Sequence, residues 1–586
     1  MKLLLLCHAF NGLTQRLHCA LREAGHTVAV ELDIADAVTE EAVALADPDL
    51  VIAPFLKRRI PESVWSVRPC LVVHPGPPGD RGPAALDWAV LRGDAEGGVT
   101  VLQATAEFDA GPVWAFRTFP LRPGASKASL YRHEVTQGAA EAVLEALSRW
   151  QPGAAGPGSM PALPAPPAWG GGWQGPVPRA HRCIDWTRDD TTTVLRKIRS
   201  ADGHPGVADT LFGRACRLHD AHAATAATLQ RAPQGAPGAV VATRGPALLR
   251  RTVDGGVWIG HVRAEAAPGE PALKLAATRV FAAACAALPA LEVPLPHDVD
   301  EWDELRYEET GAPGQRVGWL AFDFHNGAMS TRQCERLRDA LRFVRTRATR
   351  VLVLEGGADF FSNGIHLHDI EAAAQTPGDG AADASWRNIN AIDDVVLEML
   401  TMTDRLTVAL LRGNAGAGGC WLAFAADRVW AHEGVVLNPH YKNMGNLYGS
   451  EYWTATLPRR VGEARAAEVA QRVMQGRLPM SAAQCASLGL VDAVFPAGGE
   501  ALRRRAAAEA ESLAAACDHG EHLAAKQRQR DADEARHPLA GAREQELQQM
   551  HRNFYGFDPS YHVARHHFVT RKPHAWTPRH LATHRP

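Results

Sequence analysis

One stretch near residue 410 constrains the fold of this chain more than any other. At 408–431 the sequence reads VALLRGNAGAGGCWLAFAADRVWA, in which an apolar strand runs into four glycines and then into a run of small residues. Glycines at a strand-to-helix turn let a ligand reach backbone N–H groups, and the helix start orients these donors toward negative charge. The pattern predicts a strand, a turn that stabilises negative charge, and a helix.

A second turn of the same kind lies roughly fifty residues upstream. At 351–371 the sequence reads VLVLEGGADFFSNGIHLHDIE, where a buried strand breaks at a glycine pair and the chain continues through FFSNG. Two such turns can each give one N–H group to a single carbonyl oxygen, which is the arrangement of an oxyanion hole.

The two turns in this order resemble the enoyl-CoA hydratase/isomerase (crotonase) superfamily, and the resemblance spans roughly 317–496. It implies a ββα spiral domain that binds coenzyme A. Matched residue by residue, it places the two oxyanion N–H donors on Asn363 and Gly418, with Gly364 in the same turn.

Length and composition narrow the class of protein. A chain of 586 residues is too long for one core, so about three domains are expected. A net charge of −3 gives no positive field for a nucleic acid or an anionic membrane. The early apolar run is too short for a signal peptide or a spanning helix, so we expect a cytoplasmic protein. Ten cysteines without C-x-x-C spacing indicate isolated thiols.

The amino-terminal part has the pattern of an α/β sheet. We expect strands at 3–7 and 26–31 with an amphipathic helix at 13–24 between them, which is a βαβ start. The first turn, HAFNG, lacks the G-x-G-x-x-G dinucleotide fingerprint. An open parallel sheet of this Rossmann-like kind places its ligand at the carboxyl ends of the strands.

A loop after a later strand carries polar groups to that edge. The sequence continues from PCLVV into HPGPPGDRGP and later into DAGPV, which brings His74, Arg81, Gly82 and Asp109 after predicted strand ends. The pattern resembles the formyltransferases that use formyl-tetrahydrofolate. The resemblance implies that Arg81 and Gly82 form a folate-site loop, that His74 stabilises an oxyanion, and that Asp109 fixes its protonation and relays a proton. Val72 stands where that family has a catalytic Asn. This difference argues against the family's usual transfer of the formyl group to an amine more than it argues against folate binding.

The crotonase-like half departs from a hydratase at both acid/base positions. Trp421 takes the register of the first catalytic Glu and cannot transfer a proton, so alkene hydration is disfavoured. The segment that follows offers Tyr441 and, ten residues later, Glu451, which we expect to act as the acid/base pair. His440 has the register of the second lost Glu and is a further candidate. The alternative is that Tyr441 only packs and that Glu451 is a helix charge favoured by the dipole.

The order of these parts gives the domain boundaries and an α/β fold class. The barrel is similar to the OB-like subdomain of transfer-RNA formyltransferases. The predicted parts are a formyltransferase-like domain (1–150), a Pro/Gly linker (151–178), a small β-barrel (179–265), a connector (266–315), a crotonase-like domain (316–500) and a C-terminal helical region (501–586).

The whole chain, together with PHYKNMGNLYGSEYW and FYGFDPSYHVARHHFVTRK, resembles the HypX (HoxX) family of NiFe-hydrogenase maturation factors. The resemblance implies that a formyl group passes from formyl-tetrahydrofolate to coenzyme A, and that formyl-CoA is then split to CO and CoA. Glu451 or Tyr441 would move the formyl proton toward the sulfur. The implied partners are small-molecule substrates and a NiFe-hydrogenase large-subunit precursor or other maturation proteins.

Two other functions stay open from the sequence. One is an amine formyltransferase whose degenerate crotonase domain only binds CoA, and the other is a maturation scaffold without catalysis. His562 and His566 have the i, i+4 spacing of zinc ligands, but no third ligand accompanies them, so we expect a basic helix face and no metal.

Overall fold

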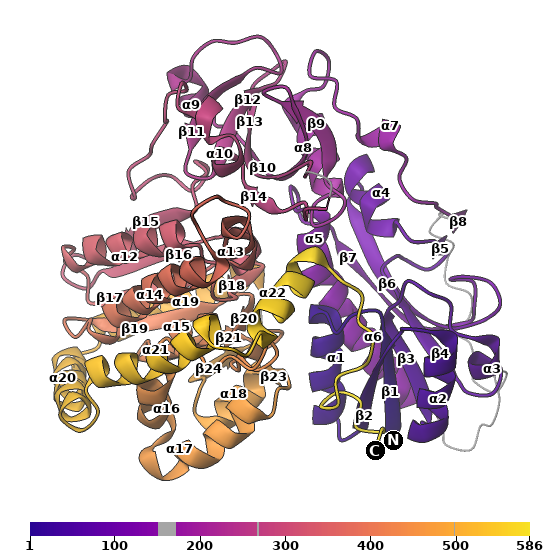
Figure 1. The fold of residues 1–586 in the computed structure, drawn as a ribbon. Helices are drawn as coiled ribbons and strands as arrows, with labels where there is room; N and C mark the ends of the chain where they lie inside the picture. The colour runs from indigo at the N-terminus through magenta and orange to yellow at the C-terminus, as the bar shows by residue number, and fades with distance from the viewer. Residues whose placement is uncertain (151–171, 267–268, 497) are drawn as a thin grey trace. The chain divides into compact units, whose positions relative to one another are not determined.

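The computed structural model describes residues 1–150, 172–266, 269–496 and 498–586, and most of the predicted linker lies outside these ranges. The chain divides into two compact units (Figure 1). The first comprises Met1–Glu265, Ala276–Pro289 and Pro573–Pro586, and the second comprises Ala266–Leu275 and Ala290–Lys572. No helix among the described residues is long and apolar enough to cross a membrane.

A twisted sheet forms the centre of the amino-terminal part of the first unit. Its strands follow the order β2 (Thr27–Leu32), β1 (Lys2–Cys7), β3 (Leu50–Phe55), β4 (Cys70–His74), β6 (Glu96–Gln103) and β7 (Val113–Pro120). The first four are parallel and the last two are antiparallel additions. Leu3 to Leu6 of β1 are buried, as their apolar run predicts, and helix α1 (Gly12–Glu23) follows with an Asn11 cap. The predicted βαβ start is confirmed.

The second part of the first unit is a small antiparallel β subdomain. Its strands pair in the order β11 (Val240–Arg244), β12 (Ala247–Arg251), β13 (Gly256–Ala264), β10 (Arg214–Ala223) and β9 (Val207–Leu211). Helix α8 (Thr191–Ser200) buries Val194 and Ile198 in the same core as Leu218 and Ile259 of the strands.

The second unit repeats one local pattern three times. Each time a long strand of the main sheet turns sharply into a short strand of a second sheet. The pairs are β17 (Val351–Gly356) with β18 (Phe360–Ser362), β19 (Leu406–Leu411) with β20 (Asn414–Gly416), and β21 (Arg428–His432) with β22 (Val436–Asn438). The long strands are parallel to one another, as are the short ones. The repetition brings the three turns to one edge, which is the predicted spiral arrangement.

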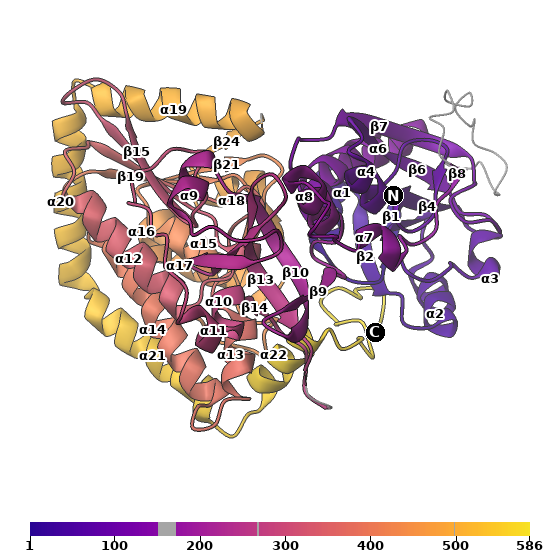
Figure 2. The same cartoon turned by 90° about the horizontal axis from the view of Figure 1, so that it is seen from above.

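Helices cover this edge and supply side chains from distant parts of the sequence. Helix α14 (Ala381–Leu400) lies between α12 (Thr331–Arg345) and α21 (Leu539–Tyr555), and it packs against both (Figure 2). The C-terminal helices also include α19 (Gly499–Ala515), α20 (His519–Arg536) and α22 (Ser560–Thr570). After α22 the chain returns to the first unit, where the Val30 N–H donates to Leu581 O at 3.0 Å.

Candidate active sites

The candidate formyl-transfer site surrounds His74 at the carboxyl end of β4. His74 is buried, and its Nε2 atom lies 2.9 Å from Asp80 Oδ1. Its Nδ1 atom lies 3.6 Å from Asp109 Oδ2, which accepts the Gly82 N–H at 3.0 Å. The structure therefore brings the predicted residues His74, Gly82 and Asp109 together at the edge where an open α/β sheet binds its ligands.

Asp80 is a part of this site that sequence analysis missed. Its second carboxylate oxygen accepts the Gln174 side-chain N–H at 2.6 Å, so both oxygens are held. Its signal was its place in the HPGPPGDRG loop, directly before the predicted Arg81. The Arg81 guanidinium pairs with Glu107 at 2.8 Å and is not bonded to the His74 group.

The Gly-rich turns of the second unit lie close together. Helix α15 (Gly418–Phe424) starts at Gly418, and a Cβ placed on Gly364 would lie 3.3 Å from the Gly418 nitrogen. A Cβ on Gly418 would itself overlap the Glu451 carboxylate. The structure therefore places Gly364, Gly418 and Glu451 next to one another.

The expectation that the Asn363 N–H serves as an oxyanion donor is wrong. This N–H donates to Gly327 O at 2.6 Å, because the loop after β16 (Val317–Phe322) pairs with this turn. The Gly364 N–H is also taken, by Ser362 Oγ at 3.0 Å. Within the described residues, the N–H groups of Ile365 and Gly418 have no hydrogen-bond acceptor in the protein. Both are therefore open to a ligand.

Glu451 and Tyr441 form the buried pair that the sequence predicted as candidates. The Tyr441 O–H donates to Glu451 Oε2 at 2.6 Å, and the Ser450 N–H reaches the same oxygen at 3.1 Å. Burial, reinforced by the charge of Asp393, raises the pKa of the Glu451 carboxyl well above its usual value. Because Oε2 already accepts two hydrogen bonds, the proton belongs on Oε1, the atom beside Gly418.

Two further buried carboxyl groups lie behind this pair, and sequence analysis missed both. Asp393 comes from α14 and Glu546 from α21, and neither side chain is exposed to solvent. Burial raises the pKa of Asp393 to about 7 and that of Glu546 to about 8. A single acidic residue on a helix carries no local signal of this kind, because its neighbours come from elsewhere in the chain.

Trp421 has a structural role at the position of the hydratase acid. Its side chain is fully buried against Phe424 and Trp453, and its indole N–H donates to Pro439 O at 2.9 Å. The position therefore fixes the loop that carries Tyr441.

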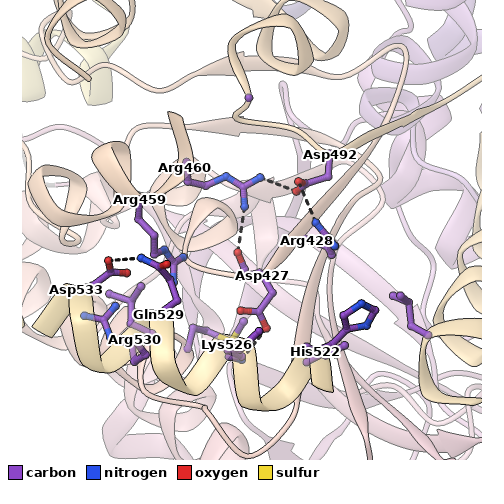
Figure 3. Close-up of a pocket in the computed structure, with 17 residues that line it drawn as sticks. Asp427, Arg428, Arg459, Arg460, Asp492, His522, Lys526, Gln529, Arg530 and Asp533 are labelled. Carbon is purple, nitrogen blue, oxygen red and sulfur yellow. Dashed lines mark hydrogen bonds and ion pairs between the residues drawn. The ribbon is translucent and has the colours of Figure 1, made fainter. Parts of the chain in front are cut away.

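Cationic side chains hold the other end of α15, beside a cavity of about 410 Å³ (Figure 3). Arg459 donates to Ala425 O at 2.7 Å, and Arg460 donates to Ala426 O at 3.2 Å. Lys526 pairs with Asp427 at 2.6 Å. Cations at a helix C-terminus bond to its free carbonyls and interact favourably with the helix dipole. These arginine and lysine side chains therefore stabilise the helix that begins at Gly418.

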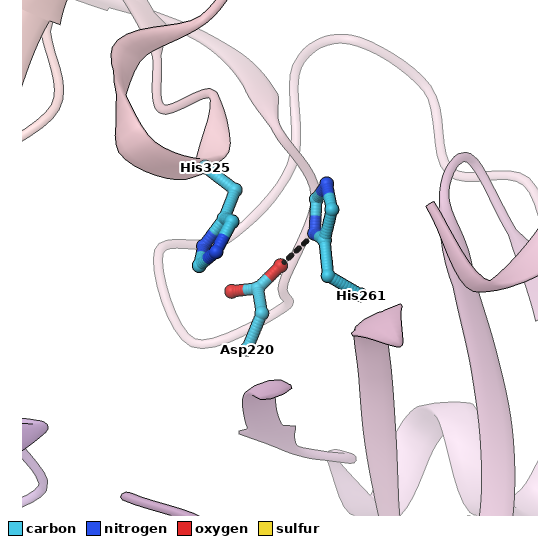
Figure 4. Close-up of side chains that lie close together, drawn as sticks. All are labelled: Asp220, His261 and His325. Atoms are coloured by element: carbon cyan, nitrogen blue, oxygen red, sulfur yellow. Dashed lines mark hydrogen bonds and ion pairs between the residues drawn. The ribbon is translucent and has the colours of Figure 1, made fainter. Parts of the chain in front are cut away.

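Three histidines whose positions could suit a metal ligand, His261, His562 and His566, bond to other protein groups. Asp220 of β10 accepts from His261 Nδ1 of β13 at 2.8 Å, which links the two strands (Figure 4). In α22, His566 Nδ1 lies 2.8 Å from Glu371 Oε1, and His562 Nε2 lies 2.8 Å from Phe554 O.

Comparison with family models gives three successive matches along the chain. The formyl transferase model matches residues 16–147, and the formyl transferase C-terminal domain model matches residues 177–277. The enoyl-CoA hydratase/isomerase model matches residues 323–579.

The hydrogenase maturation factor HoxX of Bradyrhizobium diazoefficiens is 54% identical over 591 residues, which cover 100% of this chain and 97% of that protein. The chain belongs to the HoxX (HypX) family of hydrogenase maturation factors. A crystal structure of HypX from Aquifex aeolicus in complex with tetrahydrofolic acid is 44% identical, with a TM-score of 0.91 over 100% of this chain and 99% of that one. The predicted family and fold class are confirmed.

A more distant relative matches only the first part. The methionyl-tRNA formyltransferase of a Janthinobacterium species is 30% identical over 211 residues, which are 35% of this chain and 62% of that enzyme. This HoxX-family chain therefore combines formyltransferase domains with a crotonase-like domain.

Proposed function

We propose that this HoxX-family protein makes carbon monoxide for the active site of a NiFe hydrogenase in two steps. A formyl group first passes from formyl-tetrahydrofolate to the thiol of coenzyme A, and the formyl-CoA is then split into CO and CoA. The observation that carries the proposal is the buried carboxyl of Glu451, which keeps its proton beside the Gly418 turn of a crotonase-like domain.

The residues around His74 suit the first step. The thiol sulfur attacks the formyl carbon, the bond to the folate nitrogen breaks, and the thiol proton ends on that nitrogen. Asp80 holds one ring nitrogen of His74 at 2.9 Å, while the other faces Asp109 across 3.6 Å. This second distance is too long for a direct hydrogen bond, so a reacting group between His74 and Asp109 would contact both. The tetrahydrofolic acid complex of the Aquifex relative supports folate as the donor.

The Gly418 turn suits a thioester. The free N–H groups of Ile365 and Gly418 can donate to the thioester oxygen, and the missing side chain of Gly364 leaves room for it. Two N–H donors at neighbouring Gly-rich turns are what the crotonase resemblance implies for a thioester oxygen, so coenzyme A fits the residues that are present.

Glu451 can carry the proton in the second step. The C–S bond breaks with its electron pair on sulfur, and the C–H pair of the formyl group becomes the lone pair of CO. Glu451 Oε1 gives its proton to the sulfur, and the carboxylate so formed takes the formyl proton, which restores the acid. Tyr441 holds Oε2 at 2.6 Å and so keeps Oε1 directed at the turn. A hydrogenase large-subunit precursor or another maturation protein would receive the CO.

A direct assay separates the three candidate functions. Pure protein is incubated with formyl-tetrahydrofolate, with and without CoA, and CO is measured from the absorbance of haemoglobin. CO that requires CoA supports the proposal. Folate turnover only after an amine is added indicates an amine formyltransferase, and no turnover in any mixture indicates a scaffold.

A further inference from the structure

We propose that Asp393 is a positioning residue for Glu451, and that it fixes both the backbone and the protonation state of the acid. The inference extends the proposed second step. It assigns a task to a carboxylate on α14 that lies 58 residues before Glu451 in the chain.

The backbone at Glu451 needs external support. Glu451 has a φ of 62° and Tyr452 a φ of 58°, and two consecutive residues with side chains rarely adopt this left-handed conformation. In this conformation of the chain, the side chain of Glu451 reaches Gly418. Something must therefore hold the pair in place.

Two buried carboxyl groups hold the backbone of Glu451 and Tyr452, one from earlier in the sequence and one from later. Asp393 Oδ1 accepts the Glu451 N–H at 2.8 Å, and the Ser450 hydroxyl lies 2.8 and 3.0 Å from the two Asp393 oxygens. Glu546 of α21 accepts the Tyr452 N–H at 2.9 Å. The left-handed segment is thus bonded to two different helices.

The ionisable groups around Glu451 are mostly acids. Its neighbours are Tyr441 in its own loop, Asp393 of α14, Glu546 of α21 and Cys334 of α12. The cation among them is Arg543 of α21, which lies 3.9 Å from Asp393 but is bonded to Asp394 at 2.7 Å.

This arrangement decides which carboxyl group of the pair keeps a proton. Both oxygens of Asp393 accept hydrogen bonds, and such bonds favour the charged form. Within the part of the chain that the structure describes, no hydrogen-bond donor reaches Glu451 Oε1, which faces the Gly418 turn. The negative charge on Asp393 then disfavours a second charge on Glu451, so Glu451 is the member that stays protonated.

The test replaces Asp393 by Asn, which keeps the shape and removes the charge. The Asn oxygen still accepts the Glu451 N–H, and its amide can donate to the Ser450 hydroxyl. With formyl-CoA supplied directly, we expect Asp393→Asn to lower kcat on the order of 10-fold near pH 8, with KM changed less than about threefold. The high-pH limb of the kcat profile should move to lower pH, because Glu451 loses its proton sooner.

Asp394→Asn is the matched control. Asp394 is the next residue of α14, and its carboxylate is bonded to Arg543 at 2.7 Å, whereas the Glu451 N–H donates to Asp393. Its profile should coincide with that of the parent protein. An equal shift of the high-pH limb of the kcat profile in both variants would indicate a general charge effect and overturn the proposal.

A second readout does not depend on CO release. The infrared C=O band of a protonated carboxyl that disappears in Glu451→Gln reports the protonation of Glu451 alone. This band should be lost at lower pH in Asp393→Asn than in the parent, and loss at the same pH would overturn the proposal. If the parent releases no CO but the band shifts as expected, the proposed function fails and the positioning role stands. Should Asp393→Asn not fold, Ser450→Ala should shift the band in the same direction by a smaller amount.

Discussion

The Oε1 atom of Glu451 occupies the space that a side chain on Gly418 would need. The backbone of Gly418 is not left-handed, so the glycine is required by this close approach and not by its own conformation. One residue thus provides an N–H donor and also lets the acid come beside it. This contact joins the two functional groups of the proposed decarbonylation site.

Gly418→Ala should abolish CO release from formyl-CoA, because the methyl group displaces the Glu451 carboxyl from the turn. The loss should be on the order of 100-fold or more, as for removing an acid or an oxyanion donor. Gly520→Ala is the control, since a Cβ there meets no atom within 4 Å. A Gly418→Ala protein with parental activity would place the chemistry elsewhere.

Glu451→Gln should accumulate formyl-CoA without releasing CO, because it keeps the size of the side chain and removes its transferable proton. Tyr441→Phe removes only the hydroxyl that holds Oε2 at 2.6 Å, so it should give a partial block. Mass spectrometry of the acyl-CoA pool measures both effects. CO release at the parental rate by Glu451→Gln would move the search for the acid to His440.

His74→Ala and Asp109→Asn should each slow folate deformylation on the order of 100-fold or more. Asp80→Asn should cost less, about 10-fold, because Asp80 only orients the imidazole through Nε2. CO release from supplied formyl-CoA should be unchanged in all three. Near-normal deformylation in His74→Ala would refute the assignment of this site.

The stability of the protein should fall as the pH rises from about 4 to about 7, in part because of Asp393. Burial raises its pKa from 3.8 to about 7, so in this range the folded state binds the proton that the unfolded chain has lost. The free energy of unfolding therefore decreases through this window, on the order of 2 to 4 kcal/mol from this group. Calorimetry of Asp393→Asn should show a smaller decrease. The same pH dependence in both proteins would contradict the assigned shift.

Much of the fold was predictable because the signals are local. The apolar strand of β1 and the Gly-rich turns appear directly in the sequence, and each element forms where its pattern predicts. Tyr441 and Glu451 are also close in sequence, so one loop could be expected to carry both.

The rest depends on contacts between distant segments. Asp393 and Glu546 meet the Glu451 segment through the packing of α14 and α21, which no residue spacing encodes. The Asn363 prediction failed for a related reason. The match to the family pattern located the turn correctly. The Asn363 N–H, however, donates a hydrogen bond to Gly327 O, which lies 36 residues away in sequence.

The most direct measurement of the central claim follows the carbon atom itself. Formyl-tetrahydrofolate labelled with ¹³C in the formyl group is incubated with the full chain and CoA, and the gas is trapped on haemoglobin for infrared detection. The account predicts ¹³CO in an amount equal to the tetrahydrofolate formed, with none when CoA is omitted or Glu451 is replaced by Gln. Tetrahydrofolate formed with ¹³C-formate or a formylated amine as the product, and no ¹³CO, would contradict it.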